Sequence, residues 1–67
     1  MDKLKNKLKV LRAERNISQE DLAKAVGVSR QTVNAIEGGD YSPSVVLAMK
    51  ISSYFSRKVE EVFSLER

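Results

Sequence analysis

The feature that most constrains this chain is a pair of helix starts separated by a glycine. Ser18 has the character of an N-cap, and the aspartate three residues further on completes a capping box in place of the more usual glutamate. Gly27 lies between two valines, where glycine allows a positive φ in a turn that is buried on both sides. Ser29 is a second N-cap. The pattern predicts one helix over about 19–25 and another over about 30–38, joined by a tight turn.

The two predicted helices divide into an apolar and a polar face. The side chains expected to face inward are apolar and helically spaced: Leu22, Val26, Val28, Val33 and Ile36. The outward side chains of the second helix are polar and gather at its N-terminal end: Arg30, Gln31, Thr32 and Asn34. Arginine and glutamine can bond bidentately to guanine and adenine edges in the major groove, and a helix N-terminus favours phosphates. Each residue alone is typical of a solvated helix, but the combination favours DNA contact.

The remaining segments also read as short helices. Leu4, Leu8 and Leu11 predict a first helix over about 3–15. A fourth helix follows Ser44 as its N-cap, with an apolar stripe made by Leu47, Ile51, Tyr54 and Phe55. A break at 56–58 precedes a last short helix over about 59–65, marked by Val59, Val62 and Phe63. Because no segment sustains period-two alternation, we predict no sheet.

Composition excludes several classes of function. A chain of 67 residues holds one domain with a small core. It contains no cysteine and no histidine, which excludes a disulfide framework, a cysteine zinc site and a histidine-based catalytic triad. No metal-ligand cluster, phosphate-binding loop or nucleophile with an adjacent base is present, so we expect neither a cofactor nor an enzyme. The net charge of +3 permits a polyanionic partner without demanding one.

The location and partners follow from similar reasoning. No window approaches the roughly 18 apolar residues of a membrane span, and the first residues lack the apolar core of a secretion signal. We therefore expect a cytoplasmic protein without a membrane partner. The lysines of the first predicted helix could form a DNA-binding stripe or a solvated face opposite its leucines, and the second interpretation is favoured. We expect no domain for a small-molecule effector.

The motif resembles a known family. The segments SQEDLA at 18–23 and GVSRQTVNAIE at 27–37 look like the helix-turn-helix of the lambda-repressor/Cro family, also called the XRE family. The similarity continues through YSPS at 41–44, covers nearly the whole chain, and is greatest to short stand-alone regulators of bacteria and archaea. It implies an all-α, five-helix domain over 1–67, with its central helix-turn-helix at about 19–38.

The resemblance also implies roles for individual residues. The positions that match DNA-contacting residues of the family are Gln19, Ser29, Arg30, Gln31, Thr32, Asn34, Tyr41 and Ser42. Gln19 would bond a phosphate and brace the first recognition residue, so replacing it should weaken binding without changing the preferred sequence. Arg30 and Gln31 would reach base edges. Arg12 and Glu37 match a structural ion pair that also orients the DNA-facing surface.

Other matching positions concern the helix cap and the loop. Ser29 would cap the recognition helix and touch a phosphate, while Thr32 would meet a thymine methyl group or a phosphate. Asn34 would contact a base or the backbone. Tyr41 and Ser42 would hold the opposite phosphate strand, although a loop tyrosine can equally pack on its own domain. Asp40 departs from the family pattern, and an aspartate facing phosphates would cost affinity unless it points away.

The expected function is that of a transcriptional regulator. The favoured interpretation is a repressor that binds a palindromic operator in double-stranded DNA as a homodimer. Of the apolar residues near the C-terminus, some must close the core and the others are expected to be exposed for self-association: Val59, Val62, Phe63 and Leu65. The resemblance implies that dimers form through this region, at Val59, Val62 and Phe63. The alternative is a protein-interaction module, as some domains of this family act as antitoxins. The polar outward face of the second motif helix suits bases better than a dry protein interface.

Overall fold

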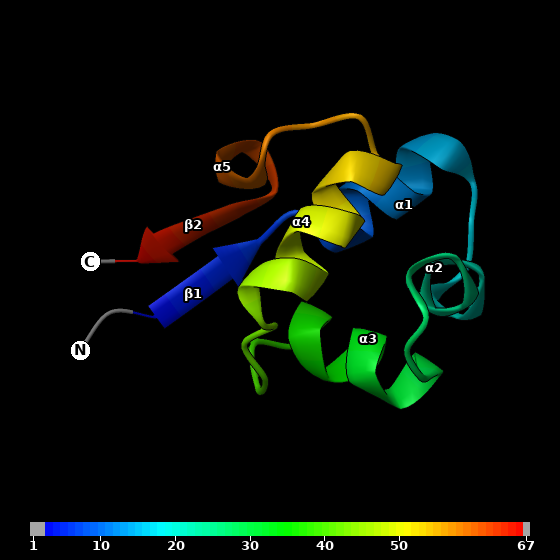
Figure 1. Cartoon of the computed structure of the whole chain (residues 1–67), viewed down its shortest axis with the longest axis horizontal. Helices are drawn as coiled ribbons and strands as arrows, with labels where there is room; N and C mark the ends of the chain where they lie inside the picture. Colours follow the sequence, from blue (N-terminus) through cyan, green and yellow to red (C-terminus); the bar gives the residue numbers. More distant parts are fainter. Residues whose placement is uncertain (1–2, 67) are drawn as a thin grey trace.

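A computed structural model describes residues 3–66 and shows a helical bundle flanked by a small sheet (Figure 1). Its elements are, in order, β1 (Lys3–Asn6), α1 (Leu8–Arg15), α2 (Gln19–Val26), α3 (Arg30–Glu37), α4 (Val45–Tyr54), α5 (Val59–Val62) and β2 (Phe63–Glu66). The two strands lie together at one end of the molecule, beside both chain termini, and α3 lies at the outer edge of the bundle opposite α1 (Figure 1). No helix in this part of the chain has the length and apolarity needed to cross a bilayer.

The predicted helix caps are confirmed. The hydroxyl of Ser18 accepts the backbone N–H of Asp21 at 3.0 Å, and the Asp21 carboxylate accepts the backbone N–H of Ser18 at 3.0 Å. The backbone hydrogen bond from Ser18 lowers the pKa of Asp21. Ser29 and Ser44 cap α3 and α4 by accepting N–H groups at 3.1 Å. Each cap satisfies a donor that the first helical turn leaves without a partner, which fixes where the helix begins.

The predicted turn is also present. Gly27 ends α2 with φ +78°, in the left-handed region, and its N–H donates to Ala23 O at 2.9 Å. Asn16 ends α1 in the same region, with φ 55°. The chain can therefore reverse within a few residues after each helix, because both residue types tolerate this conformation.

The core lies where the helices meet. Its buried apolar members are Leu8, Leu11, Leu22, Ala23, Val26, Val33, Ile36, Ile51, Phe55, Val62 and Phe63. Leu22 and Val33 are completely buried and belong to α2 and α3 respectively, so the two helices of the motif share one apolar interior. The expected inward set is confirmed, except that Val28 is only half-buried. Burial of each large apolar side chain contributes about 1.5–3 kcal/mol, which holds the two helices at a fixed angle.

The expectation of an all-α fold without a sheet is wrong at both ends of the chain. The first helix begins at Leu8 and not near residue 3, and the last helix ends at Val62 and not near residue 65. The residues beyond them pair as antiparallel strands, with Leu4 opposite Leu65. The fold is therefore mostly helical with a small two-stranded sheet among the described residues.

The sheet was missed because each strand has four residues, which is too short to reveal its period. Leu4 also continues the helical spacing of Leu8 and Leu11, and this coincidence favoured a longer helix. Asn6 resolves the ambiguity in the structure. Its side-chain oxygen Oδ1 accepts the N–H of Leu8 at 3.1 Å and so competes with continuation of the helix, while its side-chain Nδ2 donates to Ile36 O at 2.9 Å.

Candidate nucleic-acid interface

The candidate site is the outward face of α3. Val33 and Ile36 fix the helix to the core from one side and are 0% and 2% exposed. Arg30, Gln31 and Asn34 lie on the other side and are exposed, as the sequence predicted for the polar face. Arg30 and Gln31 lie at the N-terminal end of α3, which begins shortly after the turn at Gly27. A protruding polar helix on a rigid base is a shape that fits the major groove of DNA.

The first turn of α3 is closed by hydroxyl groups. Besides capping the helix, the Ser29 hydroxyl lies 3.0 Å from that of Thr32. Thr32 is half-buried, whereas Ser29 is exposed. The two hydroxyls therefore hold each other, and their remaining hydrogen-bonding capacity faces solvent beside Arg30 and Gln31.

Tyr41 lies beside the same face. A shallow hollow of about 260 Å³ is lined by Ser29, Gln31, Thr32, Ala35 and Tyr41, so the structure brings the loop tyrosine next to the recognition surface. Its side chain is 50% exposed. Ser42 is exposed as well. The adjoining Asp40 donates its N–H to Ala35 O at 2.9 Å, which ties the loop to the end of α3.

An ion pair anchors α3 to α1. Arg12 donates to Glu37 through Nε at 2.6 Å and through Nη2 at 3.0 Å, a bidentate arrangement. The two side chains are 15% and 5% exposed. Arg12 also donates to Ile17 O at 3.0 Å, so its guanidinium links α1, α3 and the segment before α2.

The electrostatics of this pair favour its charged form. Burial opposes ionisation of Glu37, but hydrogen bonds from Arg12 and Gln19, with the nearby positive charges, outweigh it, and the pKa of Glu37 falls below its usual value. The hydrogen bond to Glu37 likewise raises the pKa of Arg12, against the effect of desolvation. The carboxylate is therefore ionised at neutral pH and can only accept hydrogen bonds.

Gln19 joins the same network. Its Nε2 donates to Glu37 Oε1 at 3.1 Å and to Asn34 Oδ1 at 3.2 Å. The structure thus connects the expected ion pair of Arg12 and Glu37 to two of the expected DNA-contacting residues, Gln19 and Asn34. The sequence contained each of them, but their direct connection depends on the packing of α1 and α2 against α3.

The residues expected at a dimer contact differ in how far they are exposed to solvent. Val62 and Phe63 are 1% and 7% exposed, so both side chains close the core of the single chain. Val59 is half-buried. Leu65, in β2, is 51% exposed, so among these apolar C-terminal residues it is the one whose exposure suits self-association.

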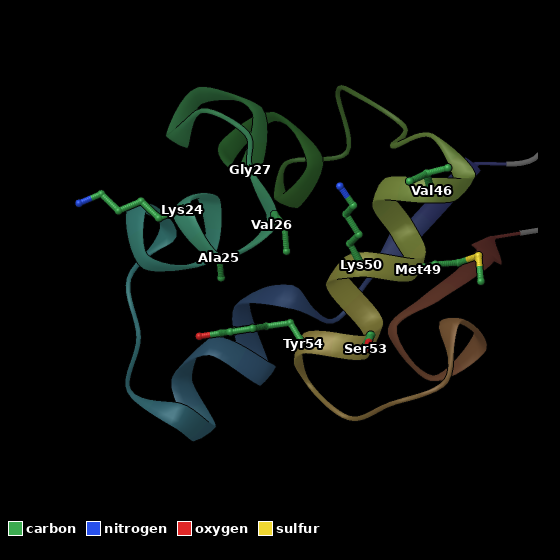
Figure 2. Close-up of a pocket in the computed structure, with 9 residues that line it drawn as sticks. All are labelled: Lys24, Ala25, Val26, Gly27, Val46, Met49, Lys50, Ser53 and Tyr54. Carbon is green, nitrogen blue, oxygen red and sulfur yellow. The ribbon is translucent and has the colours of Figure 1, made fainter.

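Two further surface features were not predicted. Lys3 and Lys5 of β1 line a hollow of about 230 Å³ near the C-terminal end of α3, together with Glu37 and Glu66. Lys5 forms an exposed ion pair with Glu66 at 3.4 Å, so the hollow carries charges of both signs. A larger hollow, of about 830 Å³, opens between the end of α2 and α4 (Figure 2). It is lined by Val26, Val46 and Met49 among others, and Lys24 extends away from α4 at its rim (Figure 2). None of the candidate DNA-contacting residues lines it.

Within residues 3–66 no cluster of potential metal ligands occurs.

These features define a class of protein. Two capped helices, a glycine turn and an exposed polar face on the second helix form a helix-turn-helix domain, whose second helix reads DNA in the major groove. The family model described as "Helix-turn-helix" matches residues 8–62, and the chain belongs to this family of XRE-type transcriptional regulators.

Similar proteins support the same family assignment. A helix-turn-helix-type transcriptional regulator of Methanocaldococcus jannaschii is 57% identical over 94% of this chain and 96% of its own length. One from Bacillus subtilis is 60% identical with the same coverage, 94% and 96%. Among solved structures, the restriction-modification controller protein C.AhdI from Aeromonas hydrophila is 31% identical, with a TM-score of 0.73 over 81% of this chain and 78% of that one. The chain is thus a DNA-binding regulator.

Proposed function

We propose that this chain is a repressor that binds a palindromic operator in double-stranded DNA as a homodimer. The observation that carries the proposal is the rigid presentation of Arg30 and Gln31 at the exposed start of α3. Ser29 caps this helix end, and buried Val33 holds it from behind. Such side chains can read guanine and adenine edges without first paying to order the backbone.

The neighbouring polar groups would set the register on the duplex. Ser29, Thr32, Tyr41 and Ser42 border the recognition surface and suit contacts to phosphates, which position a protein without specifying sequence. Asn34 and Gln19 would complete the contact surface. Repression then needs no further domain, because a protein bound across an operator excludes the polymerase. We assign no catalytic reaction to the chain, since its relatives are transcriptional regulators, and we place its function in the cytoplasm.

The dimer would use the exposed apolar residues near the sheet. Val45, Met49 and Leu65 are 76%, 57% and 51% exposed. Met49, Val45 and Val59 also line one apolar hollow of about 200 Å³. A two-fold contact here would place two copies of α3 about 34 Å apart, one turn of B-DNA. Val62 and Phe63 would support this surface from within, since they are buried in the single chain.

Selection of bound duplexes from a random DNA pool at physiological salt tests the recognition. We expect an enriched palindrome with half-site centres about one helical turn apart. Arg30→Ala should cost about 1–3 kcal/mol and relax the preference at one base pair, and Gln31→Ala should do the same at another. Arg57→Ala is the matched control for the charge, because Arg57 lies in the loop after α4 and its side chain forms an exposed ion pair with Glu14 at 3.5 Å.

The outcomes separate reading of sequence from attraction to charge. If Arg57→Ala weakens binding as much as Arg30→Ala, and no sequence is enriched, the contact is electrostatic and non-specific. The interaction-module hypothesis would then replace operator binding.

The dimer is tested by Leu65→Asp, with Ser64→Asp as its control. Both variants add the same charge to β2, but adjacent residues of a strand point to opposite faces. Sedimentation equilibrium should show Leu65→Asp shifted towards monomer and Ser64→Asp unchanged. A Leu65→Asp protein that remains as dimeric as the parent would place the contact elsewhere.

A further inference from the structure

Four polar side chains form a continuous chain of hydrogen bonds from the interior to the DNA-facing surface. Arg12 donates to Glu37, and Gln19 donates to Glu37 at 3.1 Å and to Asn34 at 3.2 Å. Exposure rises along this chain, from a Glu37 side chain that is 5% exposed, through a half-buried Gln19, to an exposed Asn34. The buried end is charged and fixed, whereas the outer end lies among the candidate DNA contacts.

The chemistry of the buried end dictates the direction of every bond. A guanidinium only donates and a carboxylate only accepts. The group of Gln19 that faces Glu37 must therefore be its NH₂, because two oxygens facing each other would repel. The second proton of this NH₂ points to Asn34, so the Asn34 oxygen must face Gln19. What remains for a ligand is the NH₂ of Asn34, a donor, and the Oε1 of Gln19, an acceptor.

We propose that Glu37 is a positioning residue for sequence recognition: through Gln19 it makes Asn34 a hydrogen-bond donor, and leaves Gln19 an acceptor, on the DNA-facing surface. This inference rests on the proposed function and deepens it. Asn34 then donates to an acceptor, either a phosphate oxygen or the O6, N7 or O4 atoms of bases. It does not read adenine bidentately, because that geometry needs its oxygen as well.

The same polarity changes the role expected for Gln19. A phosphate only accepts, and both amide protons of Gln19 are already donated within the protein. A phosphate contact would require one of these bonds to break. Its free oxygen instead suits the amino group of cytosine or adenine in the major groove. Gln19 is therefore inferred to contribute to sequence preference, and not only to affinity.

Glu37→Gln tests the proposal at a residue whose side chain is almost fully buried. The amide introduced at position 37 has a single oxygen. Because Arg12 only donates, this oxygen faces Arg12, and the NH₂ of the amide faces Gln19. Gln19 must then present its oxygen inward, and the polarity of the outer groups reverses. We expect roughly a tenfold change in base preference at one or two positions of the enriched site. Arg12→Lys is the matched control, because it weakens the same ion pair but leaves a carboxylate facing Gln19, and it should retain the parent sequence.

A second variant covers the case in which Glu37→Gln does not fold. Gln19→Met interrupts the relay on the surface and frees Asn34 to rotate. It should also shift the preferred sequence, whereas a simple loss of a phosphate contact would weaken binding on all sequences alike. An unchanged sequence preference in every folded variant, or the same shift in Arg12→Lys, would overturn the proposal.

A measurement without DNA separates this proposal from the proposed function. In ¹⁵N-edited NMR spectra of the free protein, both Nε2 protons of Gln19 should exchange slowly with water, and the Asn34 amide protons rapidly. Glu37→Gln should reverse this order. Fast exchange of the Gln19 protons in the parent protein would refute the relay even if operator binding holds. Slow exchange without any enriched DNA sequence would refute the operator and, with it, a recognition role for the relay.

Discussion

Gly27 offers a clean test of how the turn between α2 and α3 is built. Its φ is +78°, and a Cβ added at this position would meet no atom within 4 Å. Gly27→Ala therefore creates no clash, and its destabilising effect is the strain of an L-residue in the left-handed region, about 1–2 kcal/mol. The lower entropy of the unfolded chain offsets about 0.4–1 kcal/mol of this strain.

Gly38 provides the matched comparison a few residues away. Its φ is −78°, and an added Cβ would meet Asn34 O and Asp40 Oδ2 at 3.4 Å, an ordinary contact distance. Because alanine adopts this conformation readily, Gly38→Ala should stabilise the chain by about 0.4–1 kcal/mol through the lower entropy of its unfolded state.

Thermal unfolding followed by circular dichroism measures both effects. For a domain of this size 1 kcal/mol shifts Tm by about 4–8 °C, so Gly27→Ala should lower Tm by up to roughly 13 °C and Gly38→Ala should raise it by roughly 2–8 °C. All samples need the same protein concentration, because self-association would stabilise the folded state by mass action. Equal shifts in the two variants would refute the reasoning from backbone conformation, since both add the same methyl group.

Three further perturbations follow from the same structure. The pKa of Glu37 is lowered in the folded state. Its contribution to stability is therefore present above about pH 4.3, its unfolded value, and is lost as the pH falls through the lowered folded pKa. Urea titrations across this range should show that Glu37→Gln loses less stability on acidification than the parent protein does. Ser18→Ala removes the hydroxyl that accepts the N–H of Asp21, while the backbone N–H at position 18 can still donate to the Asp21 carboxylate. It should cost about 1 kcal/mol in urea unfolding, and a cost near zero would contradict the capping role of the hydroxyl. Leu22→Ala should cost about 2–5 kcal/mol, because the side chain is completely buried, and a milder loss would mean that the core collapses around the gap.

The accuracy of prediction from the sequence varied with the range of the interactions concerned. Ser18, Gly27 and Ser29 act on backbone groups within a few residues, so their caps and turn could be predicted from neighbouring letters alone. The β1–β2 sheet depends on residues at opposite ends of the chain, such as Leu4 and Leu65. Strands of four residues are too short for their alternation to predict the sheet from the sequence. Phe63 is the first residue of β2, so its buried position depends on the same sheet.

The candidate site divides in the same way. That Arg30 and Gln31 are exposed follows from helical spacing, and the structure adds little to it. The bond from Gln19 to Glu37 joins residues of different helices, and no local rule predicts its direction. Only the packed structure shows that an acceptor-only group faces Gln19.

The missed sheet bears on the recognition helix itself. Asn6 is the last residue of β1, and its side-chain Nδ2 donates to Ile36 O at 2.9 Å in the last turn of α3. Lys7 donates its N–H to Val62 O at 2.9 Å, which fastens the same segment to the end of α5. The start of α3 is held locally by Ser29, whereas its end is held by Asn6 and by the ion pair of Arg12 with Glu37. Through Asn6 and Lys7, the orientation of α3 also depends on β1 and on the end of α5. If α3 reads DNA as proposed, a loosened sheet should therefore reduce sequence discrimination even where every proposed base-contacting residue is intact.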